Sequence, residues 1–381
     1  TAIGGGGGGA DLYAANESSP AAQPSATGVN GIAIGDSALS SGVRGMSFGY
    51  SSTASGEDSI ALGNSTAAGD NSVTAGLYAE TTSAASSGVA IGNSSIASGP
   101  KAVALGGAAR GVGENSVAIS NSNASGEYSL AAMITNNTTS YGAQGTNSVA
   151  IGKNAKCTNT GFAIGYMTQS TAAGSSVLGF GSIGSGNKST ALGTYAKSSG
   201  YGSVAISGEP SGYYTEASAQ YSVAIGNRAL SAITGKMAYA GRCFSDNGDA
   251  QQGTFVLLSD TTDATAEALT TNKSTAGTSN QVVLPDNSAY TFTAMVVARE
   301  KASEGTEAAA FKIEGLIRRE ANAGSTVLVA STATVLSNAN GFAVAATANT
   351  THGCLALTVT GKASTNIRWV ATVTTTEVIY A

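Results

Sequence analysis

The sequence is poor in charge, proline, histidine and cysteine, and these shortages exclude several classes of protein. Charged residues make up 11% of the 381 positions, against roughly 25% in an average soluble domain. No run of about 18 apolar residues occurs, so we expect no membrane-spanning helix. Residues 1–17 lack the basic start and apolar stretch of a signal peptide, so we expect none.

Ligand-binding residue types are equally scarce. The net charge is −5 and the 18 Lys and Arg are scattered, which excludes the clustered basic surface that nucleic-acid binding requires. Three distant cysteines, Cys157, Cys243 and Cys354, form no disulfide framework or metal motif. We interpret them as free thiols, with a cross-link between chains as the alternative. One histidine, His352, excludes the usual zinc sites, so neither metal nor cofactor is expected.

Small residues are abundant instead, and they recur with regularly placed aliphatics. Glycine occurs 51 times and 42% of the residues are hydrophobic. Disorder requires few apolar residues and much charge, so this composition favours stacked β-structure with many tight turns.

One motif, apolar-Ala-apolar-Gly, recurs along residues 32–226. Its spacing is mostly 13 or 14 residues, and about fourteen copies are recognisable. The copies occupy 32–35, 46–49, 60–63, 73–76, 89–92, 103–106, 117–120, 130–132, 149–152, 162–165, 177–179, 191–193, 204–207 and 223–226. A second pattern lies between them, as in Ser-Ile-Ala-Ser-Gly at 95–99. Each unit therefore predicts two short strands and two glycine turns.

Each unit is predicted to form one coil of a parallel β-roll or β-helix, with coils about 4.8 Å apart. Alternate strand residues face opposite sides, so we expect the aliphatics to fill the interior and the intervening Ala to face outward. Two aliphatics per coil give a thin interior. We therefore expect a homotrimer in which the outward Ala and Ser faces pack against sister chains.

The units at 115–119 (Asn-Ser-Val-Ala-Ile) and 147–152 (Asn-Ser-Val-Ala-Ile-Gly) resemble the head repeats of trimeric autotransporter adhesins. The resemblance implies a left-handed parallel β-roll in each of three chains, and adhesion rather than catalysis. The sequence departs from that family in having no long heptad stalk and no C-terminal membrane anchor. We therefore expect the equivalent roll of tailed-phage fibres, which need neither feature.

After residue 235 the pattern changes to longer alternating runs. Strands are predicted at 254–258, 281–284, 290–299, 309–319, 327–330, 341–346, 355–360 and 366–373. Such a series favours an antiparallel β-sandwich, jelly-roll-like, with Trp369 in its core. Residues 253–257, 261–265, 314–320 and 366–371 resemble C-terminal domains of phage tail-fibre proteins, which implies a receptor site at the fibre tip.

The sequence therefore predicts three regions. Residues 1–30, with six glycines at 4–9, are interpreted as a flexible segment that joins the virion, or as a partly ordered tail. Residues 31–235 form the predicted β-roll, and residues 236–381 form the predicted sandwich tip.

Signals for catalysis are weak. The GxGxxG pattern at 179–184 lies within the roll and not in a βαβ unit. His352 and Cys354 have no defined third partner, and the acidic pairs 246/249, 260/263 and 304/307 lie in polar, turn-like stretches. We therefore expect a protein that is not an enzyme.

The best candidate contacts for a receptor or glycan lie where the repeat spacing stretches to 19 residues, at 133–148 and 207–222. Insertions in solenoids often bind, and these carry Tyr141, Tyr213, Tyr214 and Tyr221. Tyrosine offers an apolar ring with a hydrogen-bonding tip, so glycan contact is predicted at Tyr213 and Tyr214. The alternative is local packing or contact within the trimer.

The predicted protein is thus a phage tail fibre, part of the virion, that attaches to a host-surface glycan or protein. Its expected partners are two further copies of itself and, through its N-terminus, a tail, baseplate or adaptor protein. A bacterial adhesin head and a purely structural collar or capsid fibre are the alternatives.

Overall fold

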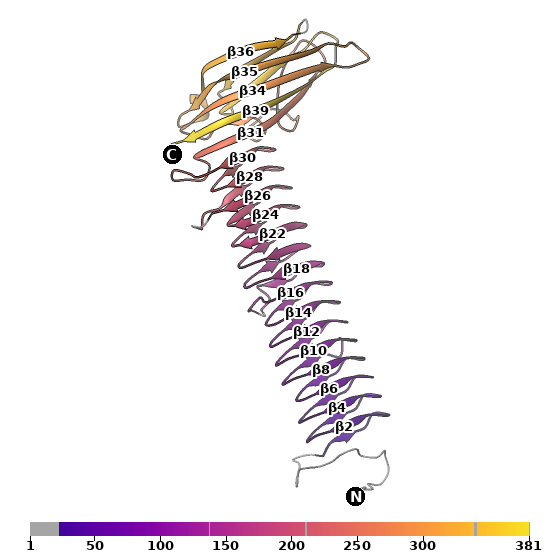
Figure 1. The fold of residues 1–381 in the computed structure, drawn as a ribbon. Helices are drawn as coiled ribbons and strands as arrows, with labels where there is room; N and C mark the ends of the chain where they lie inside the picture. The colour runs from indigo at the N-terminus through magenta and orange to yellow at the C-terminus, as the bar shows by residue number, and fades with distance from the viewer. Residues whose placement is uncertain (1–22, 137, 210–211, 339–340, 381) are drawn as a thin grey trace. The chain divides into compact units, whose positions relative to one another are not determined.

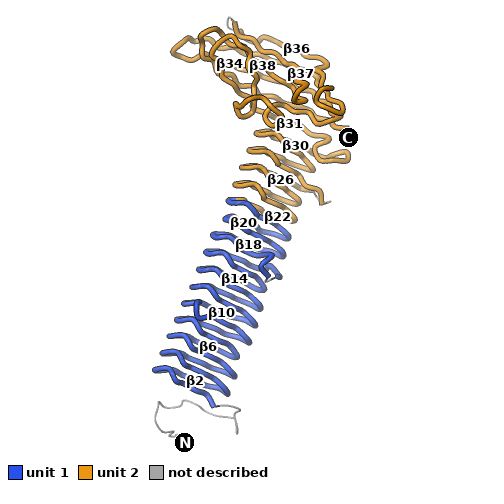
Figure 2. The backbone as a smooth tube through the Cα atoms, turned by 180° about the vertical axis from the view of Figure 1, so that it is seen from behind, with its two compact units in different colours: residues 1–174 blue, residues 175–381 orange. Residues whose placement is uncertain are grey.

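The computed structural model describes residues 23–136, 138–209, 212–338 and 341–380. Most of the predicted virion-joining segment, residues 1–22, lies outside the described residues. Within these ranges the chain is all-β apart from one 3-10 turn, Ala323–Ser325, and no helix is long and apolar enough to cross a membrane. The chain divides into two compact units, residues 1–174 and 175–381 (Figure 2).

Unit 1 consists of β-solenoid coils, each with one strand in each of two parallel sheets (Figure 1). We name the first the aliphatic sheet, which here comprises β2 (Ile32–Ile34), β4 (Met46–Phe48), β6 (Ile60–Leu62), β8 (Val73–Ala75), β10 (Val89–Ile91), β12 (Val103–Leu105), β14 (Val117–Ile119), β16 (Leu130–Ala132), β18 (Ser148–Ile151) and β20 (Gly161–Ile164). The polar sheet comprises β1 (Ser25–Ala26), β3 (Leu39–Ser40), β5 (Thr53–Ala54), β7 (Thr66–Ala67), β9 (Glu80–Thr81), β11 (Ile96–Ala97), β13 (Arg110–Gly111), β15 (Asn123–Ala124), β17 (Gly142–Ala143), β19 (Lys156–Cys157) and β21 (Gln169–Ser170).

Unit 2 begins with further coils of the same kind. Its aliphatic strands are β22 (Ser175–Phe180), β24 (Thr190–Thr194), β26 (Val204–Gly208), β28 (Val223–Gly226) and β30 (Met237–Ala240). Its polar strands are β23 (Ile183–Gly184), β25 (Ala196–Ser198), β27 (Thr215–Ala217) and β29 (Leu230–Ser231). The predicted parallel roll is confirmed, with about fifteen turns in the described residues.

The coils repeat in register because each corner requires particular residues at particular positions. Val89, Ala90 and Ile91 pair with Val103, Ala104 and Leu105 of the next coil. The glycine that follows, Gly92, has φ +129°, and a Cβ there would lie 2.6 Å from the backbone of Gly106, so only glycine fits.

The other corner uses a different device. In the Gly-Asp-Asn-Ser stretch at 69–72, Asn71 adopts a left-handed φ of 56°, which asparagine tolerates. The Ser72 hydroxyl donates a hydrogen bond to the Gly69 carbonyl at 2.5 Å. The buried hydroxyl and the carbonyl at the start of the turn therefore both have a hydrogen-bond partner. The sequence predicts glycine at both corners, and Gly69 is present at this one, where a Cβ would lie 2.4 Å from the Ala85 carbonyl oxygen. The left-handed position of this corner, however, is occupied by Asn71.

The interior of the coils is filled by alanine. Ala90, Ala104 and Ala118 are fully buried, whereas Ile91 and Ile119 are exposed. The prediction that the aliphatics point inward and Ala points outward is therefore wrong. Short corners bring the two sheets close together, and protein interiors are packed at crystal-like density, so only small side chains fit between them.

Val177 is the largest side chain in the column of interior positions that is mostly alanine, and its surroundings explain this limit. Most other coils have alanine at this position, with Ser47 and Thr74 in two of them, and Val177 is fully buried. Gly184 provides the space, since a Cβ there would lie 2.7 Å from Val177 Cγ2. A larger residue on one sheet is therefore matched by a smaller one on the other.

The rest of unit 2 is a sandwich of two antiparallel sheets. The larger contains β31 (Ala250–Thr261), β39 (Ile367–Ile379), β34 (Ser288–Glu300), β35 (Ala308–Arg319) and β36 (Val327–Ser337), paired in that order. The smaller contains β32 (Ala266–Ala268), β33 (Val282–Val283), β37 (Ala343–Asn349) and β38 (Cys354–Thr360). Strand β31 also pairs with β30, so the larger sheet continues from the coils.

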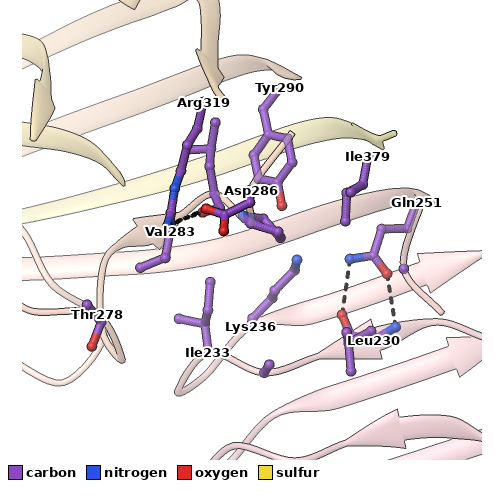
Figure 3. Close-up of a pocket in the computed structure, with 14 residues that line it drawn as sticks. Leu230, Ile233, Lys236, Gln251, Thr278, Val283, Asp286, Tyr290, Arg319 and Ile379 are labelled. Atoms are coloured by element: carbon purple, nitrogen blue, oxygen red, sulfur yellow. Dashed lines mark hydrogen bonds and ion pairs between the residues drawn. The ribbon is translucent and has the colours of Figure 1, made fainter. Parts of the chain in front are cut away.

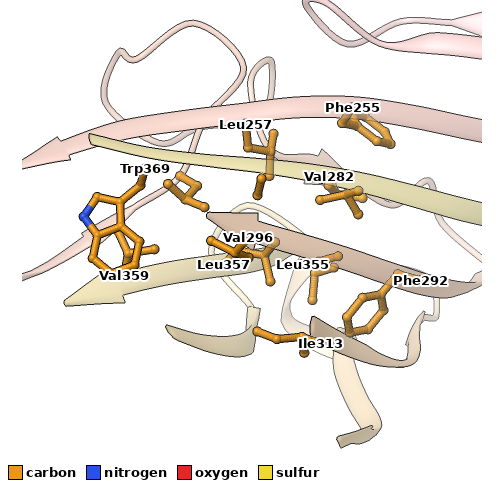
Figure 4. Packing of buried hydrophobic residues seen from close by; sticks show 14 of the residues in the cluster. Phe255, Leu257, Val282, Phe292, Val296, Ile313, Leu355, Leu357, Val359 and Trp369 are labelled. Atoms are coloured by element: carbon orange, nitrogen blue, oxygen red, sulfur yellow. The ribbon is translucent and has the colours of Figure 1, made fainter. Parts of the chain in front are cut away.

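Between the two sheets lies a core of large side chains (Figure 4). Phe255, Phe292 and Val296 of the larger sheet pack toward Leu355 and Leu357 of the smaller one. Trp369 is fully buried and its Nε1 donates a hydrogen bond to Thr261 Oγ1 at 3.0 Å. All eight predicted strands and the core position of Trp369 are confirmed, while β32 is an additional strand.

Candidate functional site

Each coil carries aliphatic side chains on the outer surface of the aliphatic sheet. Nine of the outward-facing side chains, Phe162 being the aromatic one, are 36–46% exposed: Met46, Leu62, Ile91, Ile119 and Phe162 in unit 1, and Leu178, Leu192, Ile206 and Met237 in unit 2. We name these positions in each unit the aliphatic face. The polar sheet instead presents residues such as Glu80 and Arg110. Soluble monomers rarely expose long apolar patches, so this face is suited to burial against another chain.

Tyr213 and Tyr221 are the two most exposed of the predicted contacts, and Tyr213 also stacks with a cation. Its side chain is 56% exposed, and the guanidinium carbon of Arg228 lies 4.0 Å from its ring centroid. Asn247 holds that guanidinium, because its Oδ1 accepts a hydrogen bond from Arg228 Nε at 2.9 Å. A cation fixed on one face of the ring leaves Tyr213 as a rigid aromatic platform.

Tyr214 has a different environment. Its ring packs edge-to-face on Tyr195 at 5.8 Å, and Tyr195 packs likewise on Phe180 at 5.5 Å. The backbone carbonyl of Tyr214 accepts a hydrogen bond from the Asn247 side chain at 2.7 Å. These aromatics come from successive coils and form a ladder whose rings largely satisfy one another, which leaves Tyr214 less surface for a ligand.

Tyr221 and Tyr141 are not brought together with that pair. Tyr221 follows β27, whereas Tyr213 and Tyr214 precede it, and its ring packs edge-to-face on Tyr201 at 5.6 Å. Tyr141 belongs to unit 1, where it is half-buried against the alanine core of the coils. Glycan contact at these four residues stays a prediction.

Arg228, Asn247, Tyr195 and Tyr201 are neighbours of the tyrosines that the sequence reasoning missed. Each belongs to a different coil or loop from the tyrosine it contacts. The coil period could have indicated these neighbours, because residues one repeat apart stack on each other in a parallel solenoid.

A short loop, residues 241–249, supports Asn247. The Asp249 carboxylate accepts hydrogen bonds from the backbone N–H groups of Phe244, Ser245 and Asp246 at 2.6–2.9 Å. Burial opposes ionisation, but these donors outweigh it and hold the pKa of Asp249 below its usual value. The acidic pair 246/249 is therefore used structurally, with Asp249 as the organiser of the loop.

A cavity of about 310 Å³ lies within unit 2 between the last coil and the sandwich (Figure 3). Gln251 caps the coil there, since its side-chain amide bonds both the N–H and the carbonyl of Leu230 at 3.0 Å. Lys236 Nζ lies 2.7 Å from Glu377 Oε2, and both side chains are almost fully buried. Asp286 pairs with Arg319 at 2.6 Å. The charges around this cavity are thus neutralised by one another.

Tyr290 belongs to the same buried network. Burial and the negative charge of Glu377 raise its pKa well above the usual value. Thr375 Oγ1 donates to the other oxygen of Glu377 at 2.7 Å. The buried carboxylate is therefore fully hydrogen-bonded, which is the condition for keeping a charge inside a protein.

The residues considered for catalysis are apart or otherwise engaged. Cys354 donates to Gln281 Oε1 at 3.0 Å, and burial raises the pKa of its thiol to about 12. His352 lies in a turn, where its Nδ1 is 3.2 Å from Asn349 Nδ2. All three cysteines are free in this chain. Among the described residues, no three His, Cys, Asp or Glu side chains gather where they could hold a metal ion.

Segments of the coils match a known family, described as the YadA head domain repeat (two copies). The matched residues are 26–45, 40–66, 85–109, 143–156, 185–206 and 211–229. No curated protein matches the chain. The resemblance to adhesin head repeats is thus confirmed, and such repeats imply an adhesin-like fibre with trimeric assembly, exposed outside the cell. The likeness of residues 236–381 to phage fibre domains stays a prediction.

Proposed function

We propose that this chain is a bacteriophage tail fibre, a homotrimeric virion protein that attaches to the host-cell surface and catalyses no reaction. The observation that carries the proposal is the aliphatic face. Its side chains are half-exposed in a single chain although the interior of the coils is complete without them. Burial of this surface against two sister chains stabilises the assembly by about 25 cal/mol per Å² of apolar area.

The sandwich provides a second argument for assembly. Strand β36 has the uncharged sequence Val-Leu-Val-Ala-Ser-Thr-Ala-Thr-Val-Leu-Ser and is exposed along almost its whole length. In the described part of the chain it pairs with β35 alone. Soluble proteins normally protect such an edge with charge, proline or a covering element. A neighbouring copy supplies that cover in the proposed trimer.

Attachment then depends on exposed groups repeated three times about the fibre. Tyr213, with Arg228 stacked on it, is the aromatic platform best placed to contact a glycan. Three tethered copies turn weak contacts into useful avidity. The N-terminus is proposed to bind a tail, baseplate or adaptor protein.

A bacterial adhesin head is the second candidate, because the matched repeats fit it equally well. A structural collar or capsid fibre that makes no host contact is the third. Immunogold labelling of phage particles and bacterial cells with an antibody to residues 236–381 separates these candidates. Label on tails supports the proposal, label on cell surfaces supports the adhesin, and label on collars or capsids supports the structural fibre.

Attachment itself is tested by adsorption. The full-length chain should bind host cells and compete with intact phage. Tyr213→Ala should weaken cell binding, whereas Tyr50→Ala, which removes an exposed tyrosine of unit 1, should not. A fibre that neither binds cells nor competes with phage contradicts the attachment role.

A further inference from the structure

A second cleft, of about 590 Å³, lies where β31 and β34 end and β39 begins. Arg299, Lys301 and Arg368 line it, together with Asp260 and Asn366. These three cations face the exposed carboxylate of Asp260 and the buried carboxylate of Glu300, which also lines the cleft. Lys301 pairs with Glu304 at 3.4 Å, which leaves Arg299 and Arg368 as the cations that carboxylates neutralise least.

The two arginines are directly opposed. Arg299 of β34 pairs in register with Arg368 of β39, and both side chains point to the exposed side of the sheet. Like charges directly opposite each other on an antiparallel sheet are destabilising. The folded chain gains no stability from this arginine pair at the mouth of the cleft, which favours a functional role for the pair.

Neighbouring acids do not neutralise the pair. Among the residues that the structure describes, Asp260 alone forms an ion pair with Arg368, at 4.0 Å, and its carboxylate also contacts Lys273. In the described ranges Arg299 forms no ion pair, and its Nη1 donates to the Glu307 carbonyl at 3.0 Å. The Arg368 side chain is 88% exposed. Guanidinium groups therefore remain available to an anion.

The adjacent residues on the same face are apolar. Val297 and Val370 form the next cross-strand pair on that side, and both are about half exposed. The surface thus offers two planar guanidinium forks beside a small hydrophobic patch. A carboxylate accepts paired hydrogen bonds from such forks, and the apolar face of a sugar ring can lie on the valines.

We propose that Arg299 and Arg368 bind the carboxylate of an acidic sugar in a surface glycan, with Val297 and Val370 beneath the ring. The assignment rests on the proposed attachment function and names its ligand class. The anion neutralises the opposed arginines, so binding relieves the repulsion that the free chain carries.

The test uses the full-length chain and sensor surfaces bearing polymer-linked glucuronic acid, glucose or glucose 6-phosphate. Glucuronate should bind better than glucose, which carries a neutral hydroxymethyl group in place of the carboxylate. Arg299→Gln and Arg368→Gln should each weaken glucuronate binding about tenfold, the scale of one charge-assisted contact. Arg318→Gln is the matched control, since Arg318 is exposed on the same sheet and paired with Glu320.

Melting separates a ligand role from a structural one. Arg299→Gln should keep or raise the Tm, because it removes a repulsion. Equal binding of glucuronate and glucose, a lowered Tm, or an equal loss in Arg318→Gln would overturn the site. Preference for the phosphate surface would overturn the carboxylate assignment. Cell binding that survives both substitutions rejects this site alone, whereas a wild-type chain that binds no cells rejects the attachment function.

Discussion

The solenoid coils and the sandwich use large hydrophobic side chains in opposite ways. In the coils the interior is mostly alanine, and most isoleucines, leucines and valines of the aliphatic sheet face outward. In the sandwich Phe255, Leu357 and Trp369 fill the interior, and threonines alternate with them on the outer side of the strands.

The difference shows how far the stability of each region depends on contacts with other chains. A sandwich with a complete core of large side chains gains its stability within one chain. A coil that encloses mainly small side chains such as alanine and serine gains less, and its largest apolar area remains outside for other chains. Substitutions in both regions test this contrast, beginning with the most destabilising.

The buried ion pair gives the largest expected effect. Lys236→Met leaves the Glu377 carboxylate buried without its cation, and breaking a buried pair in this way costs about 3–5 kcal/mol. Urea unfolding followed by the fluorescence of Trp369, the single tryptophan, measures the loss. Lys312→Met, which breaks an exposed pair with Glu314, should cost less than about 1 kcal/mol. Equal losses would mean that the buried pair has no special role.

The sandwich core gives the next effect. Leu357→Ala should lower the free energy of unfolding by about 2–5 kcal/mol, because it leaves a cavity in a closed core. Val256→Ala, on the exposed side of the same sandwich, should change it by about 0.5 kcal/mol or less. The same fluorescence-detected unfolding compares them. A similar loss in both would show that the outer face is buried in the assembly.

Overpacking tests the coils. Ala104→Leu introduces a large side chain into the narrow interior and should destabilise the coils by about 1–3 kcal/mol, detected by circular dichroism on heating. Glu80→Leu places the same side chain on the exposed polar sheet and should have little effect. If Ala104→Leu melts like the wild type, the interior is wider than its alanine lining indicates.

Acid should loosen the 241–249 loop. Because hydrogen bonding lowers the pKa of Asp249 in the folded chain, its stabilising contribution is complete above the unfolded pKa of about 3.9 and is lost as the pH falls through the folded value. Amide exchange of this loop, corrected for the intrinsic rate, should therefore accelerate below about pH 4. Asp249→Asn should exchange faster at neutral pH and show less acid dependence. Wild-type protection that persists at pH 2 would contradict this role.

Much of the fold could be read from the sequence. The apolar-Ala-apolar-Gly period predicts the parallel coils, and alternation predicts the sandwich strands. Alternation also groups residues such as Val89 and Ile91 on one side, but it does not say which side is inside. That choice depends on the distance between the sheets, which the corners set, so the prediction of an aliphatic interior failed.

The candidate sites were less accessible to sequence reasoning. The stretched repeat spacing predicts where Tyr213 lies, but its contact with Arg228 depends on a neighbouring coil. The opposition of Arg299 and Arg368 depends on the register of two strands far apart in the chain. Sequence patterns at short range carry no information on such pairings.

The mass of the full-length chain in solution reports whether the chains assemble through the aliphatic face. Light scattering should give three times the chain mass of 37.2 kDa, because the aliphatic face is buried between copies. Ile91→Glu combined with Ile119→Glu should shift that mass toward a single chain, since charge is then placed on the face. A wild-type chain that remains at 37.2 kDa while the coils stay folded would contradict the account.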